Sequence, residues 1–210
     1  MLLLYKNRTL ILSDQLKAIT YNSNNGIIKI NDKIENGNNP FLLATSYNTI
    51  ETAQLILNYA KENKIILKIN DKDNDGNYPF LSAIISNNIE MVKLFVNYAR
   101  ENNIVLEVNE IDNNGNYPFL CAIINNNIEM VKLLLNYPKE NSIVLEVNEK
   151  DSGNYPFLRV IINNNNIEIA KLFLNYAKEN NIILKLNKKD KSDCYPLINA
   201  IIYNNIEMIE

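Results

Sequence analysis

The chain has 210 residues, a formal net charge of −3 and no histidine, and asparagine makes up about a fifth of it. Its basic residues are dispersed along the sequence, which argues against nucleic-acid binding. No apolar run approaches the roughly 18 residues that a membrane span needs, and the MLLLY start is too short for a secretory signal. The two cysteines, Cys121 and Cys194, predict no disulfide framework, so we expect an intracellular, cytoplasmic setting.

The first segment, residues 1–31, is predicted to be a partial repeat. Tyr21 precedes a stretch at 28–31 that matches the later stretch at 67–70. The same order of residues recurs further along the chain, so this segment is expected to be the second half of a unit.

Prolines give the register of the rest of the chain. Their spacings are 39, 39, 38 and 40 residues, at Pro40, Pro79, Pro118, Pro156 and Pro196. A fixed period of this length is typical of stacked supersecondary units. We expect residues 32–210 to form an array of about 4.5 repeats, with the last one truncated in its second helix. Because such an array needs a polar cap on its final unit, the chain is expected to be a piece of a longer array or protein.

One unit can be followed from Pro79. Proline suits the first position of a helix, and a short helix is predicted from 79 to about 86. Asn87 and Asn88 then turn the chain, because asparagine tolerates left-handed backbone angles. A second helix is predicted over 89–102, where apolar residues recur at helical spacing.

The connection to the next unit has two parts. The alternating stretch IVLEVN is predicted to be extended. Residues 112–115 are predicted to form a tight turn that leads into the next proline.

The stretch DKDNDGNYPF at 71–80 raises a second possibility. Three alternating aspartates followed by Gly76 begin a calcium loop of the EF-hand type. However, the twelfth loop position is Ser82, where calcium needs a bidentate carboxylate. The next two units keep the Gly-Asn-Tyr-Pro-Phe core and lose the alternating carboxylates. We therefore predict a turn and a helix start here, and no metal site.

In this register the unit GNYPFLSAIISNNIEMVKLFVN resembles an ankyrin repeat. The family pattern of Asp-x-x-Gly-x-Thr-Pro-Leu-His-x-Ala, then x-Glu-x-Val-x-x-Leu-Leu, is matched by Asp73, Gly76, Pro79, Ala83, Glu90, Val92 and Leu94. The closing Val-Asn is matched by Val108 and Asn109, and the third unit repeats the match. The resemblance implies an all-α fold, an α-solenoid of stacked helix–turn–helix repeats joined by hairpin-like loops.

Several positions depart from the family pattern. The threonine before proline is tyrosine in four units and Asn39 in the first, which predicts the loss of a hydroxyl N-cap. The family histidine is leucine or isoleucine, and the Gly-His turn is Asn-Asn.

Each unit also carries a six-residue insert after the usual end of the second helix. The insert spans 98–103 in one unit and is predicted to add about one and a half helical turns. It begins with tyrosine in four units, which we expect to pack between repeats: Tyr59, Tyr98, Tyr137 and Tyr176. Pro138 replaces an alanine of the other inserts, and we expect that helix to kink or to end early.

The resemblance implies that a partner is bound by the hairpin tips and by two outward positions of each first helix. The tip positions are Asn74, Asp75, Asn77, Asn113, Asn114, Asn116, Ser152 and Asn154. The helix positions are Ile85, Ser86, Ile124, Asn125, Ile162, Asn163, Ile202 and Tyr203. The recurring isoleucine either forms an exposed contact stripe or packs against the neighbouring unit, and the sequence leaves both open.

The sequence offers little for catalysis. Without histidine there is no histidine base or ligand, the glycines form no phosphate loop, and neither cysteine has a base partner in sequence. We predict a non-catalytic scaffold, without cofactor or metal, that binds a protein partner through the concave face of the array. The alternatives are a regulatory or targeting arm of a larger multidomain enzyme, and a spacer with no specific partner. The near-identical, asparagine-rich tips favour the spacer alternative.

Overall fold

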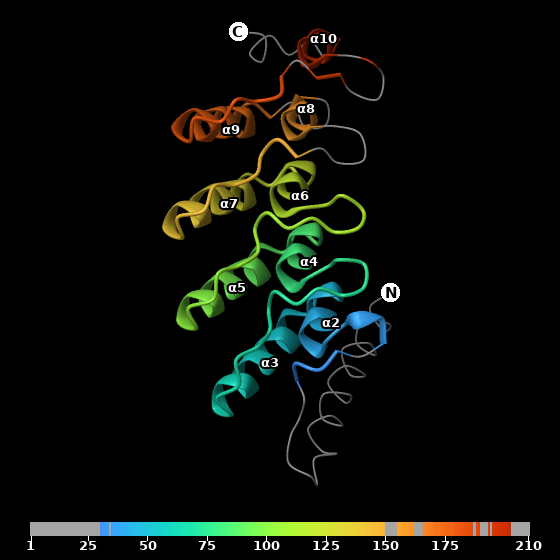
Figure 1. The fold of residues 1–210 in the computed structure, drawn as a ribbon, viewed down its shortest axis with the longest axis vertical. Helices are drawn as coiled ribbons and strands as arrows, with labels where there is room; N and C mark the ends of the chain where they lie inside the picture. The colour runs from blue at the N-terminus through green and yellow to red at the C-terminus, as the bar shows by residue number, and fades with distance from the viewer. Residues whose placement is uncertain are drawn as a thin grey trace. The chain divides into compact units, whose positions relative to one another are not determined.

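The computed structural model describes residues 30–33, 35–149, 155–161, 166–186, 188–189, 193 and 195–202. Its helices come in short-then-long pairs that follow the proline register (Figure 1). Within these residues no β-strand forms, and no helix has the length and hydropathy of a membrane-spanning segment. The predicted all-α solenoid of helix–turn–helix repeats is confirmed. The predicted partial repeat at 1–31 lies outside the described residues except at its last two.

The chain divides into two compact units, Met1–Leu106 and Glu107–Glu210. The first unit contains η1 (Glu35–Gly37), α2 (Pro40–Ser46), α3 (Ile50–Glu62), α4 (Pro79–Ile85) and α5 (Ile89–Glu101). In it, α2 packs against α3 and α4, and α4 packs against α5. Its core includes the fully buried rings of Phe41 and Phe95, whose centroids are 5.1 Å apart.

The second unit repeats this arrangement. It contains α6 (Pro118–Ile124), α7 (Ile128–Glu140), α8 (Pro156–Arg159), α9 (Ile167–Glu179) and α10 (Pro196–Ile202). Here α6 packs against α7 and α8, and α7 packs against α9. Phe173 lies 5.2 Å from the ring of Phe119 and 5.4 Å from that of Phe157.

The first helices begin at proline, as predicted, and lose the usual cap. Tyr78 and Tyr117 hold the N-cap position without a side-chain cap bond, whereas Asn39 accepts a bond from Leu42 N–H at 2.8 Å. Both tyrosine rings are buried, and the Tyr117 hydroxyl donates to the carbonyl of Glu149 at 2.8 Å. The tyrosine therefore gives up the cap and gains core packing and a bond to the next loop.

The second helices are each 13 residues long, and α5 ends one residue before the predicted boundary. An asparagine follows each helix and donates its side-chain Nδ2 to the tyrosine carbonyl four residues back, at 2.8–2.9 Å. These asparagines are Asn63, Asn102, Asn141 and Asn180. Because the last carbonyls of a helix have no intrahelical partner, this bond stabilises the helix end.

The prediction that Pro138 ends its helix early is wrong. α7 continues to Glu140, in the same register as the other second helices. Proline lacks only its N–H, and its carbonyl still accepts bonds from Asn141 N–H at 3.1 Å and Ile143 N–H at 2.9 Å. The effect is confined to the last turn, where Asn141 N–H bonds three residues back and its equivalents in the other repeats bond four residues back.

The connections alternate between buried and exposed residues, as the sequence predicts. Leu67 and Ile69 are buried, whereas Ile66 and Lys68 are exposed. Asparagine side chains tie these extended segments together. Asn31 donates to Ile66 O at 2.8 Å and accepts from Lys68 N–H at 3.0 Å, and Asn109 makes the same pair of bonds in the second unit.

Candidate functional site

The first hairpin tip is closed by its own aspartate. Asp73 Oδ1 accepts the backbone N–H of Asp75 at 2.9 Å and that of Asn77 at 2.8 Å. The Asn77 side chain also contacts this carboxylate, and Gly76 supplies the left-handed turn angle with φ of 82°. The Asp73 carboxylate of the DKDNDGNYPF stretch is thus hydrogen-bonded by N–H groups of its own loop.

The tip of the second unit has the same construction. Asp112 is buried and accepts the N–H groups of Asn114 at 2.9 Å and Asn116 at 2.8 Å. The Asn116 amide also donates to the second carboxylate oxygen at 2.8 Å. In the described part of the chain, no three histidine, cysteine or carboxylate side chains come together to hold a metal ion.

The predicted tip residues therefore have two different environments. Asn74, Asp75, Asn113 and Asn114 are exposed at the tips. Asn77 and Asn116 are half-buried and bound to their aspartates. Ser152 and Asn154 lie outside the described residues.

The predicted contact residues on the first helices also differ in exposure. Ile85 at the end of α4 is 42% exposed, and Ile124 at the end of α6 is 41% exposed. Neither side chain is buried against a neighbouring repeat, and a contact role for them remains a prediction. Ile202 is also exposed, whereas Ser86 and Asn125 are half-buried. Ile162, Asn163 and Tyr203 lie outside the described residues.

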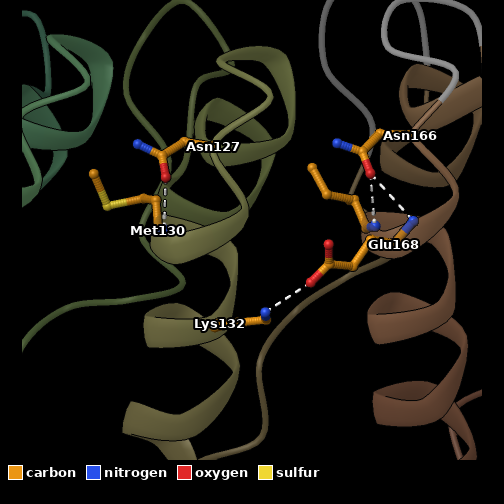
Figure 2. A network of polar contacts seen from close by, with 6 residues as sticks. Asn127, Met130, Lys132, Asn166 and Glu168 are labelled. Atoms are coloured by element: carbon orange, nitrogen blue, oxygen red, sulfur yellow. Dashed lines mark hydrogen bonds and ion pairs between the residues drawn. The ribbon is translucent and has the colours of Figure 1, made fainter.

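Asparagines at the turn before each second helix cap that helix and link neighbouring repeats. Figure 2 shows the caps in the second unit, where Asn127 caps α7 by accepting from Met130 N–H at 3.0 Å. Asn166 caps α9 through Glu168 and Ile169, and its Nδ2 donates to Asn126 of the preceding repeat at 2.7 Å. In the first unit Asn88 makes the same contact with Asn48. The many asparagines are therefore structural at repeated positions.

Two of the four insert tyrosines, Tyr98 and Tyr176, bond to the preceding repeat, as predicted. The Tyr98 hydroxyl accepts the backbone N–H of Leu67 at 2.8 Å, and the Tyr176 hydroxyl accepts that of Leu145 at 2.8 Å. Burial raises the pKa of both phenols above the ordinary value. Both rings are largely buried against the preceding repeat, and the exposed part of Tyr98 is 9%.

Cys121 does not form a reactive centre. Its thiol is buried in α6, and burial together with the nearby charge of Asp112 raises its pKa to about 12. Since the thiolate is the nucleophile, this thiol is inert near neutral pH. Cys194 lies outside the described residues.

Sequence reasoning missed one surface feature, a groove of about 460 Å³ between α3 and α5 in the first unit. Its rim includes Lys64, which has a left-handed φ of 57°. Lys64 is the sign of this feature in the sequence, because the same register position is asparagine or serine in the next three repeats.

Comparison with known proteins agrees with this architecture. The profile of the family described as ankyrin repeats (three copies) matches residues 10–105, 63–151 and 103–182. The fold is similar to the crystal structure of an ankyrin repeat domain from Acinetobacter baumannii AYE, with a TM-score of 0.67 and 18% sequence identity. The match covers 98% of this chain and 94% of that chain. No curated protein matches the sequence.

Proposed function

Because the chain belongs to the ankyrin repeat family, we propose that it is a non-catalytic module that binds a protein partner through its hairpin tips and first helices. Ankyrin repeats generally serve protein–protein interaction. The proposal places the contact surface at the exposed ends of the first helices and at the adjacent tips, on the face that is concave in the family.

The observation that carries the proposal is the exposure of Ile85 and Ile124. Single exposed apolar residues are common on protein surfaces and need no explanation. These two, however, occupy the same register position in α4 and α6, and both helices are free of charged residues. An apolar side chain at a repeated exposed position is a candidate anchor for a partner.

In the first unit an exposed aromatic ring lies at the end of the neighbouring first helix. Tyr47, which ends α2, is 48% exposed, and α2 packs directly against α4. Together Tyr47 and Ile85 offer an aromatic and an aliphatic contact, and the exposed tip residues Asn74 and Asp75 would supply polar contacts. This combination of an apolar centre and a polar rim is typical of protein interfaces.

The test compares three baits in an affinity capture from native extract. The first is the unchanged chain, the second carries Ile85→Asp and Ile124→Asp, and the third carries Leu55→Asp. Leu55 is 59% exposed on the second helix α3, so this variant adds the same charge outside the proposed surface. Circular dichroism confirms that each bait is folded.

A partner that is retained by the unchanged chain and by Leu55→Asp, but lost from the double variant, supports the proposal. A partner retained equally by all three baits places its binding elsewhere and contradicts it. Capture of nothing by any bait favours the spacer alternative.

A further inference from the structure

The groove between α3 and α5 lies on the second helices, and Figure 1 shows these helices on the side of the first unit away from its hairpin loop. Its volume of about 460 Å³ is within the range of ligand-binding clefts. The apolar lining consists of Leu57, Ala60, Ile65, Ile66, Leu94 and Tyr98. At the mouth, Ile66 is 56% exposed, so part of this lining faces solvent.

The groove also has polar lining residues, of which Lys61 pairs with Glu101 and Asn102 bonds to the Tyr98 carbonyl, whereas four others have no partner among the described residues. The side-chain amides of Gln54, Asn58 and Asn97 make no hydrogen bond to any residue that the structure describes. The Lys64 ammonium likewise has no ion-pair partner there. Asparagine amides elsewhere often bind backbone groups, but the equivalents of Asn58 and Asn97 in α7 and α9, Asn136 and Asn175, are also unbound among the described residues.

Lys64 holds an unfavourable backbone position. Its φ of 57° is left-handed, a region that asparagine and glycine tolerate better than lysine. Two equivalent positions in the following repeats carry asparagine, Asn103 and Asn181, and a third carries Ser142. Among these four residues Lys64 alone is charged, and it places a cation at the groove rim.

The equivalent surface in the second unit is bridged. Figure 2 shows Lys132 of α7 reaching Glu168 of α9 at 2.7 Å, and Lys139 reaches Glu179 at 2.6 Å further along the same helices. These two ion pairs join α7 to α9 at positions that correspond to the groove between α3 and α5 in the first unit.

In the first unit Gln54 replaces the first of these lysines, so no ion pair with Glu90 can form. The second pair, Lys61 with Glu101, is 3.9 Å long, and both side chains are mostly exposed. In the first unit, one of the two ion pairs across the groove is therefore missing, and the other is readily displaced.

We propose that this groove binds an extended segment of a protein partner that carries one large apolar side chain next to a carboxylate. The apolar side chain fills the space over Leu57 and Tyr98. An extended peptide has backbone donors and acceptors to satisfy, and the amides of Gln54, Asn58 and Asn97 offer both. The carboxylate pairs with Lys64. This surface is separate from the tips and first helices.

The test uses a random peptide library displayed on phage and selected against the full chain. Enriched peptides are synthesised, and their binding is measured by fluorescence anisotropy against the unchanged chain and single variants. We expect enrichment of peptides with an aliphatic or aromatic residue beside Asp or Glu. Lys64→Asn removes the cation and relieves the backbone strain, and we expect it to weaken binding by about tenfold.

Two further variants localise the site. Gln54→Lys introduces the cation that bridges the second unit, and we expect it to close the groove and weaken the same peptides. Lys132→Gln makes the opposite change in the second unit and is the matched control, with unchanged binding expected. Circular dichroism confirms the fold of each variant.

Three results overturn the proposal. One is a selection without acidic–apolar peptides, and another is unchanged binding to Lys64→Asn and Gln54→Lys. The third is loss of binding to Ile85→Asp alone, which assigns the peptides to the tips and first helices and leaves the proposed function standing.

Discussion

The pair α3 and α5 and the pair α7 and α9 occupy the same register of the repeat but are held together differently. Both pairs have a tyrosine hydroxyl that accepts a buried backbone N–H, from Leu67 in one and from Leu145 in the other. Only α7 and α9 add two close ion pairs across their exposed face. Buried neutral contacts are thus common to both helix pairs, whereas the charges on their exposed faces differ. A new binding surface can arise on these exposed faces.

The largest expected effect comes from the buried rings that both units share. Phe173→Ala should lower the free energy of unfolding by about 3–5 kcal/mol, and Phe95→Ala should cost less within the same range. The reason for the difference is that Phe173 contacts two rings, whereas a single ring contact is found for Phe95 among the described residues.

Urea denaturation followed by circular dichroism measures both variants. Because repeat arrays unfold with separable parts, the transition midpoints of the two units are compared as well as the total free energy. A larger loss at Phe95 than at Phe173 contradicts this account of the two cores.

The repeat architecture was largely predictable because it depends on local sequence. The prolines, the helical spacing of apolar residues and the asparagine turns place α4 and α5 to within about one residue. The loss of the tyrosine cap was predictable for the same reason. The expected early end at Pro138 was wrong because the sequence shows the missing N–H but not the closing bonds that its carbonyl accepts.

The candidate surfaces were predictable only in part. Exposure of Ile85 depends on how α4 is rotated against its neighbours, which sequence spacing does not fix. The groove depends on which charges face each other between repeats about 40 residues apart. Its sequence signals are Gln54 and Lys64, two substitutions at positions that otherwise recur.

The next effect concerns the tyrosine bonds that the two pairs have in common. Tyr98→Phe and Tyr176→Phe should each cost about 1–3 kcal/mol, because each leaves a buried backbone N–H without its acceptor. Hydrogen exchange should speed up at Leu67 in the first variant and at Leu145 in the second. Equal exchange at both amides in both variants would contradict the assignment of one bond to each tyrosine.

The same tyrosines predict a loss of stability at alkaline pH. Burial raises the folded-state pKa of Tyr98 and Tyr176 above the ordinary value of 10.0. Ionisation therefore favours the unfolded chain, so the stabilisation is fully present below about pH 10 and is lost as the pH rises through the folded-state values. Thermal melts across this range should show a steeper decline for the unchanged chain than for the double phenylalanine variant. Parallel curves would mean that ionisation of these phenols does not contribute to the loss of stability.

The smallest effect tests the difference between the two pairs directly. Lys132→Gln removes one ion pair whose side chains are about half exposed, so solvent screening limits the expected loss to about 0.2–1 kcal/mol. Gln54→Lys should gain a similar amount by pairing with Glu90. A double-mutant cycle with Glu168→Gln for the second unit, and with Glu90→Gln for the first, isolates each pair from other effects of the lysine. Both coupling energies should shrink as salt is added, because the charges are exposed. If the Gln54→Lys cycle shows no coupling, the lysine does not reach across α3 and α5, and the first unit's groove stays open for a geometric reason beyond the missing charge.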